Sequence, residues 1–211
     1  MNSSLDTLAT ARRSIRKYVD KEVPESAIRE MIALAATAPS PSNQQPVRYV
    51  RMVSQDVRHR VFTDMETGYE SRVSQAKKLE KPRKAINILN HYRRYSRFMC
   101  HAPALFAVGV EKGGASFSKR MNRAGIPMGE ALGVMGKDIS LGLSLQLFML
   151  GAVEQGLGTC ILTAPLHFLD SDNPIVGLEN LRVGCFVTLG FPDETPVDPG
   201  RKPLAEIYWE A

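Results

Sequence analysis

The sequence predicts an α+β fold in which helices pack on a β-sheet. Helical and strand-like segments are mixed along the chain, without the strict alternation of strand and helix that builds a doubly wound parallel sheet. Short apolar segments bounded by polar, Gly or Pro residues are typical of strands, whereas longer segments with a helical repeat indicate helices. The predicted strands cover residues 47–53, 103–110, 159–162 and 181–189.

The N-terminal part of the chain begins with two predicted helices. Apolar residues recur at helical spacing from Leu5 onward, so we expect a short helix over residues 4–13. Pro24 suits the first turn of a second helix, where a proline removes no helical hydrogen bond. Pro39 ends this helix, and its apolar stripe comprises Ile28, Met31, Ile32, Ala35 and Ala36.

A polar loop and a long helical stretch follow. Residues 38–46 contain three prolines, which restrict the backbone, and Ser, Asn and Gln side chains, which supply hydrogen-bonding groups. The strand over 47–53 leads into residues 55–98, which are largely helical with a break expected at Pro82.

The second half of the chain contains the most apolar predicted helix. Residues 103–110 form an apolar run suited to a buried strand, while residues 111–130 have no clear period and are expected to form a variable loop or a short helix. The helix over 131–155 has few polar positions, which favours burial on most sides, with a partner subunit as one covering surface. Gly156-Leu157-Gly158 ends it.

Length and composition are those of a globular chain. With 211 residues, 44% of them hydrophobic and 23% charged, we expect one domain over residues 1–211. Three cysteines without CxxC spacing argue against a disulfide framework and favour a cytoplasmic protein, and the four histidines lack metal-ligand spacing. The polar N-terminus has no signal-peptide pattern. The longest apolar stretch, 141–153, is too short for a membrane span of about 20 residues, so we expect no membrane partner.

Three common chemical motifs can be rejected. Cys100 and His101 are neighbours in sequence, and neighbouring side chains usually point apart, so a buried structural cysteine is favoured over a nucleophile. Gly156-Leu157-Gly158 follows a helix and lacks the third glycine of a dinucleotide fingerprint. Gly136-Lys137 is not followed by the Ser or Thr that a phosphate-binding P-loop requires.

Positive charge is concentrated in one segment. Residues 76–97 contain eight basic residues against the single acid Glu80, while the formal net charge of the whole chain is +5. A solvated helical face that draws in anionic ligands is favoured over a nucleic-acid-binding module, because the segment lacks the interleaved Phe, Trp or Gly of single-strand binders. Tyr92 and Tyr95 keep the nucleic-acid alternative open.

Four short segments carry the functional prediction. The first groups three guanidinium groups and a hydroxyl, and guanidinium binds phosphate in bidentate fashion. In chain order, the segments resemble the four signatures of the nitroreductase family and together span residues 12–204. They are Arg12-Arg13-Ser14-Ile15-Arg16-Lys17-Tyr18, Ala38-Pro39-Ser40-Pro41-Ser42-Asn43-Gln44-Gln45-Pro46, Gly156-Leu157-Gly158-Thr159-Cys160-Ile161-Leu162-Thr163 and Arg201-Lys202-Pro203-Leu204.

The resemblance implies a mostly antiparallel sheet, an intertwined homodimer and a non-covalently bound FMN at the subunit interface. Arg12, Ser14 and Arg201 would contact the phosphate and ribityl chain, and Arg16 the pyrimidine edge. The backbone of Leu162 and Thr163 would face the flavin N5 edge, and the loop would reach the flavin of the other subunit. The candidate cofactor-binding residues are Arg12, Arg13, Ser14, Arg16, Pro39, Ser40, Ser42, Asn43, Leu162, Thr163 and Arg201.

The implied activity is that of an FMN oxidoreductase. NADH or NADPH would reduce the flavin and leave, and a nitro compound, a quinone or a similar small acceptor would be reduced in turn by a ping-pong mechanism. The flavin carries this chemistry, so no side-chain acid or base is required. The alternatives are a reductive dehalogenase or ene-type reductase of the same fold, and a flavin-binding protein without turnover.

Three departures, two from the family pattern and one from its dehalogenating branch, bear on these alternatives. Val47 replaces an aromatic residue that often follows the second signature, and residues 111–130 match no recognisable pattern. The dehalogenating branch has a Thr directly before the Pro of the third segment, where this chain has Ala164. The absence of that hydroxyl favours two-electron, hydride-type reduction.

Overall fold

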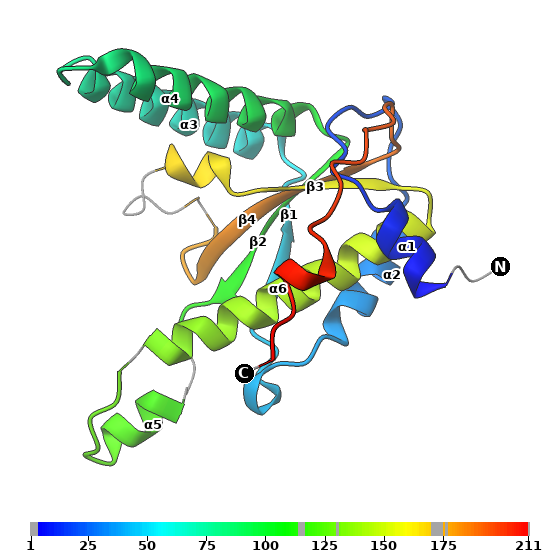
Figure 1. Ribbon diagram of the computed structural model, residues 1–211, viewed down its shortest axis with the longest axis vertical. Helices are drawn as coiled ribbons and strands as arrows, with labels where there is room; N and C mark the ends of the chain where they lie inside the picture. The colour runs from blue at the N-terminus through cyan, green and yellow to red at the C-terminus, as the bar shows by residue number, and fades with distance from the viewer. Residues whose placement is uncertain (1–3, 114–116, 130, 170–174, 176, 211) are drawn as a thin grey trace.

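Four antiparallel strands form the central sheet of the computed structural model, which describes residues 4–113, 117–129, 131–169, 175 and 177–210 (Figure 1). The spatial order is β1-β2-β4-β3, so β1 and β3 are the two edges of the sheet. All three pairings are antiparallel, which confirms the predicted fold class. The strands are β1 Val47–Arg51, β2 Ala104–Glu111, β3 Gly158–Leu162 and β4 Leu181–Gly190.

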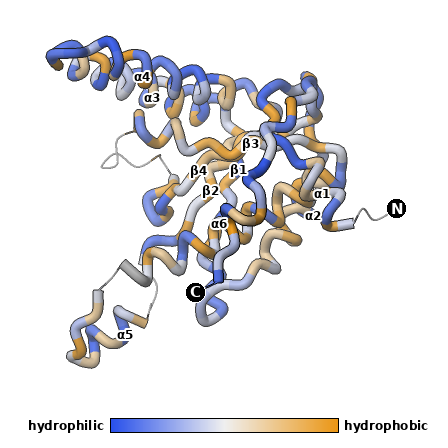
Figure 2. Tube along the Cα trace, in the orientation of Figure 1, coloured by the Kyte–Doolittle hydropathy of each residue, from blue (hydrophilic) through white to orange (hydrophobic). Residues whose placement is uncertain are grey.

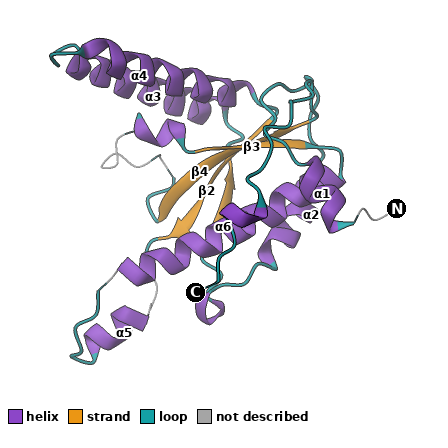
Figure 3. Ribbon diagram, in the orientation of Figure 1, coloured by secondary structure: helices purple, strands orange, loops and turns teal. Residues whose placement is uncertain are grey.

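Helices cover both faces of this sheet (Figures 1 and 3). On one face α2 and α6 pack around Phe106 and Phe148, and on the other α3 packs around Leu105 and Phe186. The helix α4 lies against α3 and forms a hairpin with it that extends away from the sheet (Figure 1). The helices are α1 Leu5–Ala11, α2 Glu25–Ala36, α3 Gln55–Ala76, α4 Pro82–Arg97, α5 Phe117–Arg123 and α6 Ala131–Glu154.

Short 3₁₀ turns connect these elements. The turn η1 lies in the polar loop, η2 follows α4, η3 follows β3, and η4 lies in the C-terminal arm. Their bounds are η1 Pro41–Asn43, η2 Phe98–His101, η3 Ala164–His167 and η4 Leu204–Glu206. None of the helices in the described part of the chain has both the length and the apolarity that a membrane crossing requires.

A short sequence at the end of α6 directs the chain from this helix into β3. Gly156 adopts a left-handed backbone with φ of 69°. The Leu157 N–H donates to the Ala152 carbonyl at 2.8 Å, and the Gly156 N–H to the Val153 carbonyl at 3.0 Å, which is the Schellman pattern. The predicted helix stop is thus confirmed, and the chain turns sharply from α6 into β3.

The structure differs from the predicted elements mainly at their ends. The first helix covers residues 5–11 and β1 ends at Arg51, both shorter than expected. Pro24 is the N-cap of α2 and so precedes its first turn. The break in the 55–98 stretch lies in the five residues before Pro82, which begins α4. The short helix allowed for in 111–130 is α5.

Candidate functional site

The first signature segment lies along the edge strand β3. Ser14 forms a parallel bridge with Thr159, and the Ile15 N–H donates to the Thr159 carbonyl at 2.9 Å. A Cβ on Gly158 would lie 2.5 Å from the Ile15 side chain, so a residue larger than glycine would push the two segments apart. The first and third signatures, almost 150 residues apart in sequence, therefore meet because β3 lies at an edge and begins with a glycine.

The segment after β4 fixes the other side of the first signature. The Val19 N–H donates to the Phe191 carbonyl at 2.9 Å, and the Asp193 N–H donates to the Lys17 carbonyl at 3.0 Å. The Glu194 carboxylate accepts hydrogen bonds from the backbone N–H groups of Arg16 and Lys17. These contacts hold the backbone of Arg16 in place and do not involve its guanidinium group, which donates a hydrogen bond to the Ser14 carbonyl at 3.4 Å.

The Arg16 guanidinium lines a cavity of about 270 Å³ beside the end of β3. It lies over the Tyr95 ring from α4, at 5.3 Å from the ring centre, a cation–π distance. Leu162 and Thr163 also line this cavity, so three predicted cofactor-binding residues come together here. The other lining residues are His91, Tyr92, Cys160, Ile161 and Ala164.

The guanidinium groups of Arg13 and Arg201 contact other parts of the protein than the Arg16 guanidinium does. Arg13 forms an ion pair with Asp198 at 2.6 Å, which ties the first signature to the segment leading into the fourth. Arg201 is exposed and donates to the carbonyl of Gly200 at 2.6 Å. Arg12 is the C-cap of α1 and is half-buried. Contacts of Arg12, Arg13 and Arg201 with a cofactor stay predictions.

The loop that carries Pro39, Ser40, Ser42 and Asn43 lies at the opposite edge of the sheet. It leads into β1, whereas the first signature contacts β3, and β2 and β4 lie between them. Three strand spacings of roughly 4.8 Å place the two edges about 14 Å apart. A single chain therefore does not assemble all the predicted site residues into one pocket.

The same loop holds an unusual backbone conformation. Ser42, Asn43 and Gln45 have φ values of 52°, 51° and 46°, in the left-handed region that non-glycine residues seldom adopt. The Ser40 hydroxyl accepts a hydrogen bond from the Gln45 N–H at 2.8 Å, which closes the loop on itself. Each such conformation costs on the order of 1 kcal/mol, and strain of this kind is concentrated at functional sites.

Cysteine chemistry and metal binding do not compete with this interpretation. Burial raises the pKa of Cys100 to about 11 and that of Cys185 to about 12, and it also raises the pKa of Cys160, so the thiols are protonated at neutral pH. The favoured interpretation of Cys100 as a structural residue agrees with this shift. Within the described ranges, no group of His, Cys, Asp and Glu side chains could hold a metal ion.

The sequence did not indicate the residues of α4 as part of the site. Tyr95, His91 and Tyr92 stood out only as aromatic residues in a basic segment, and their helix is remote in sequence from all four signatures. Glu194 was also missed, because a lone carboxylate in a loop carries no pattern. An amphipathic analysis of α4 would have placed the two tyrosines together but not beside Arg16.

Comparison with known proteins identifies the family. The nitroreductase family model matches residues 9–191. The chain belongs to the nitroreductase family. It is 26% identical to a 4-nitrobenzoate reductase from Nocardioides sp. (strain LMS-CY) over 90% of this chain and 81% of that protein. Membership makes the chain an oxidoreductase of this family and confirms the predicted family; the matched range contains the first three of the four segments.

Solved structures show the same fold. A BluB-like flavoprotein from Clostridium difficile 630 matches with a TM-score of 0.81, covering 99% of both chains at 22% identity. An iodotyrosine deiodinase bound to FMN and 3-iodo-L-tyrosine matches with a TM-score of 0.62, covering 95% of this chain and 96% of that one at 18% identity. Proteins of this fold thus include flavoproteins and an FMN complex.

Proposed function

We propose that this chain binds FMN without a covalent bond and catalyses the reduction of a nitro compound, a quinone or a similar acceptor by NADH or NADPH. The observation that carries the proposal is the cavity at the end of β3, where Arg16, Leu162 and Thr163 meet. Residues 1–211 would form a single flavin-binding domain. In a homodimer, each flavin site would contain residues from both subunits.

The residues present fit a flavin mononucleotide. Arg16 provides a cation whose guanidinium forms no ion pair with any described acid, and the backbone beside it is held by Glu194 from outside the cavity. Among the residues that the structure describes, no Asp or Glu lines the cavity, so its described lining carries no negative charge that would repel an anion. Arg12 and Arg201 would hold the phosphate, because each guanidinium group can donate two parallel N–H hydrogen bonds to phosphate oxygens.

Bound FMN would supply the redox chemistry, and the side chains would bind and orient it. Arg16 would place a positive charge beside the pyrimidine edge, where negative charge accumulates on reduction. Leu162 and Thr163 would offer backbone hydrogen-bonding groups from the edge of the sheet, where a strand has unpaired groups on its outer side. Tyr92 and Tyr95 would exclude water from the same side. No step requires a protein acid or base.

The exposed apolar surface supports a homodimer. Trp209 is 80% exposed, and it shares the C-terminal arm with other exposed apolar residues. Ile139, 55% exposed, lies on a stripe of α6 with three more. Apolar patches of this kind mark interaction sites. The exposed residues are Val134, Met135, Ile139 and Leu143 of α6 and Val197, Leu204, Ile207, Tyr208 and Trp209 of the arm.

An anaerobic titration tests the proposal. The purified protein should be yellow, with about one flavin per chain, and NADH or NADPH should bleach the flavin in the absence of oxygen. Adding a nitroaromatic compound or a quinone should restore the colour. A colourless protein that takes up no FMN would contradict the cofactor assignment. A yellow protein that neither nicotinamide reduces would instead be a flavin-binding protein without this turnover.

A further inference from the structure

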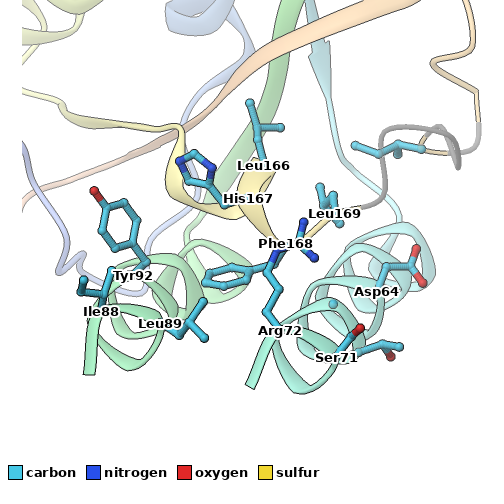
Figure 4. Close-up of a pocket in the computed structure, with 13 residues that line it drawn as sticks. Asp64, Ser71, Arg72, Ile88, Leu89, Tyr92, Leu166, His167, Phe168 and Leu169 are labelled. Atoms are coloured by element: carbon cyan, nitrogen blue, oxygen red, sulfur yellow. The ribbon is translucent and has the colours of Figure 1, made fainter. Parts of the chain in front are cut away.

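The helix α4 carries a row of aromatic side chains whose first member, Tyr95, lies beside Arg16. Arg16 lies over Tyr95, and the Tyr95 and His91 rings are 4.7 Å apart between centres. The Tyr92 ring then contacts His167 of η3 edge to face, at 5.7 Å between centres. Tyr92 and His167 also line a second cavity, of about 870 Å³, between α3, α4 and η3, where Figure 4 shows them on neighbouring elements. The row leads away from the candidate flavin site along one helix.

The row continues into an exposed groove with positive charge at its outer end. His91 and Tyr92 line both the cavity at Arg16 and this groove, which runs along α4 to Lys84 and Lys81. We call it the α4 groove; its lining residues are Lys81, Pro82, Arg83, Lys84, Asn87, Ile88, His91 and Tyr92. The α3–α4 hairpin is the strongly hydrophilic arm in Figure 2.

The cations of the α4 groove have no protein partners. No described residue forms an ion pair or a hydrogen bond with the side chain of Lys81, Arg83 or Lys84. By contrast, Arg93 on another side of the same helix is bonded to Glu66 of α3. The basic residues in and next to α4 therefore include two, Arg93 and Arg97, that pair with Glu66 of α3, and a group in the α4 groove that is free to bind an anion.

The spacing along the helix suits a dinucleotide. Lys84 precedes His91 by seven residues, which at 1.5 Å per residue is about 10 Å along α4. A pyridine dinucleotide has a redox ring at one end and phosphates separated from it by a ribose, so a ring at the flavin places the phosphates outward on this scale. The aromatic row would pack against the nicotinamide ring and the ribose that joins it to the phosphates.

We infer that the α4 groove binds the phosphates of the NADH or NADPH that reduces the flavin, with Lys81 and Lys84 as the main contacts. This inference rests on the proposed function, because it places the nicotinamide ring beside a flavin at Arg16 and Thr163. The extra 2′-phosphate of NADPH adds negative charge at the basic end, so the groove should bind NADPH more tightly than NADH.

The test measures the binding of oxidised dinucleotides, which are not consumed. The double variant Lys81→Gln/Lys84→Gln removes two charges from the α4 groove, and Lys77→Gln/Lys78→Gln removes two from the same hairpin outside it. FMN-loaded protein is titrated with NADP⁺ and with NAD⁺ by calorimetry at two salt concentrations. The groove variant should bind NADP⁺ about tenfold more weakly, with a smaller salt dependence, and the control should change by less than twofold.

The outcomes separate the inference from the proposed function. A chain that takes up no FMN overturns the proposed function and the inference with it, and absorbance shows this before the titration. An FMN-loaded groove variant with the wild-type dissociation constant for NADP⁺ overturns the inference alone. A raised KM for 4-nitrobenzoate with unchanged NADP⁺ binding would assign the groove to an anionic acceptor and would also overturn it.

Discussion

Glu194 supports the candidate flavin site through backbone hydrogen bonds, without lining the cavity. Its carboxylate accepts hydrogen bonds from the backbone N–H groups of Arg16 and Lys17, while the Arg16 side chain faces the cavity. Hydrogen bonds to an ionised group contribute roughly 1.5–3 kcal/mol each. The position of the Arg16 cation therefore depends on a residue that does not line the cavity.

We predict that Glu194→Ala lowers FMN affinity about tenfold without unfolding the protein, because the Arg16 backbone loses its restraint. Flavin titration of apoprotein measures the affinity, and circular dichroism checks the fold. Asp193→Ala is the matched control, since that neighbour contributes only its backbone N–H, to the Lys17 carbonyl. Equal FMN affinities in the two variants would show that Glu194 does not position Arg16.

Cys185 makes the stability of the protein depend on alkaline pH. The thiol is 2% exposed, and burial raises its pKa to about 12. In the unfolded chain a thiol ionises near pH 8.5, approximately. Between that pH and 12 the unfolded state binds fewer protons than the native state, so the free energy of unfolding falls as pH rises. Below about pH 8.5 the contribution is fully retained.

We predict that the melting temperature falls less between pH 8 and pH 10 in Cys185→Ala than in the wild type. The difference in unfolding free energy approaches about 1.4 kcal/mol per pH unit at most. Val187→Ala, on the same face of β4, is the control, because it removes buried volume without removing a titrating group. Parallel pH profiles for the wild type and Cys185→Ala would refute the assignment.

At the residue scale, the sequence indicated which types of residue the site contains, but not which groups each of them contacts. Arg12, Arg13 and Arg16 look equivalent as a cluster of guanidinium groups, yet Arg13 is paired with Asp198 and Arg16 lines the cavity. That difference depends on a carboxylate some 185 residues away, and no local pattern encodes it.

At the element scale, the approach of the first signature to β3 depends on Gly158. We predict that Gly158→Ala destabilises the protein by about 1–3 kcal/mol, because its Cβ would overlap Ile15, and that it weakens FMN binding. Thermal melting and flavin titration measure the two effects. In the control Gly156→Asn both should be small, since Asn tolerates a left-handed backbone and no atom lies within 4 Å of the new Cβ. Similar losses in both variants would contradict the packing argument.

The elements themselves were largely predictable from sequence. The apolar run of β2 is buried at every position before Glu111, as expected of a central strand. The stop of α6 and the break before Pro82 were also predicted, because Gly and Pro act locally through the backbone. The strand order and the packing of α4 against η3 were not predicted, because they depend on contacts between segments remote in sequence.

At the scale of the whole molecule, α6 leaves a stripe of apolar side chains exposed that a second copy would cover. We predict that Ile139→Glu raises the dimer dissociation constant at least about hundredfold, because each interface would bury two uncompensated charges. Analytical ultracentrifugation at micromolar concentration measures it. Val53→Glu is the control, because Val53 follows β1 and is 70% exposed, against 55% for Ile139. This variant should leave the dimer intact. A wild-type protein that is monomeric and loaded with flavin would contradict the dimer itself.

The separation of the site residues between two edges of the sheet leads to the last prediction. If sites are shared, the loop with Ser40 and Ser42 serves the flavin held by Arg12 and Arg201 of the other subunit. Homodimers of Arg12→Ala/Arg201→Ala and of Ser40→Ala/Ser42→Ala should both bind FMN weakly. The three prolines of residues 38–46 restrain this loop before binding, so less entropy would be lost when the flavin binds.

A mixed dimer of these two variants distinguishes a shared site from a site built within one chain. With sites confined to single chains, each site carries one pair of defects, and every site binds FMN weakly. With shared sites, one site collects both pairs of defects and the other collects none. We therefore predict that purified heterodimers bind FMN at half occupancy with wild-type affinity, measured by flavin absorbance and titration. Uniformly weak binding would rule out the shared site while leaving the assignment of the phosphate-binding arginines intact.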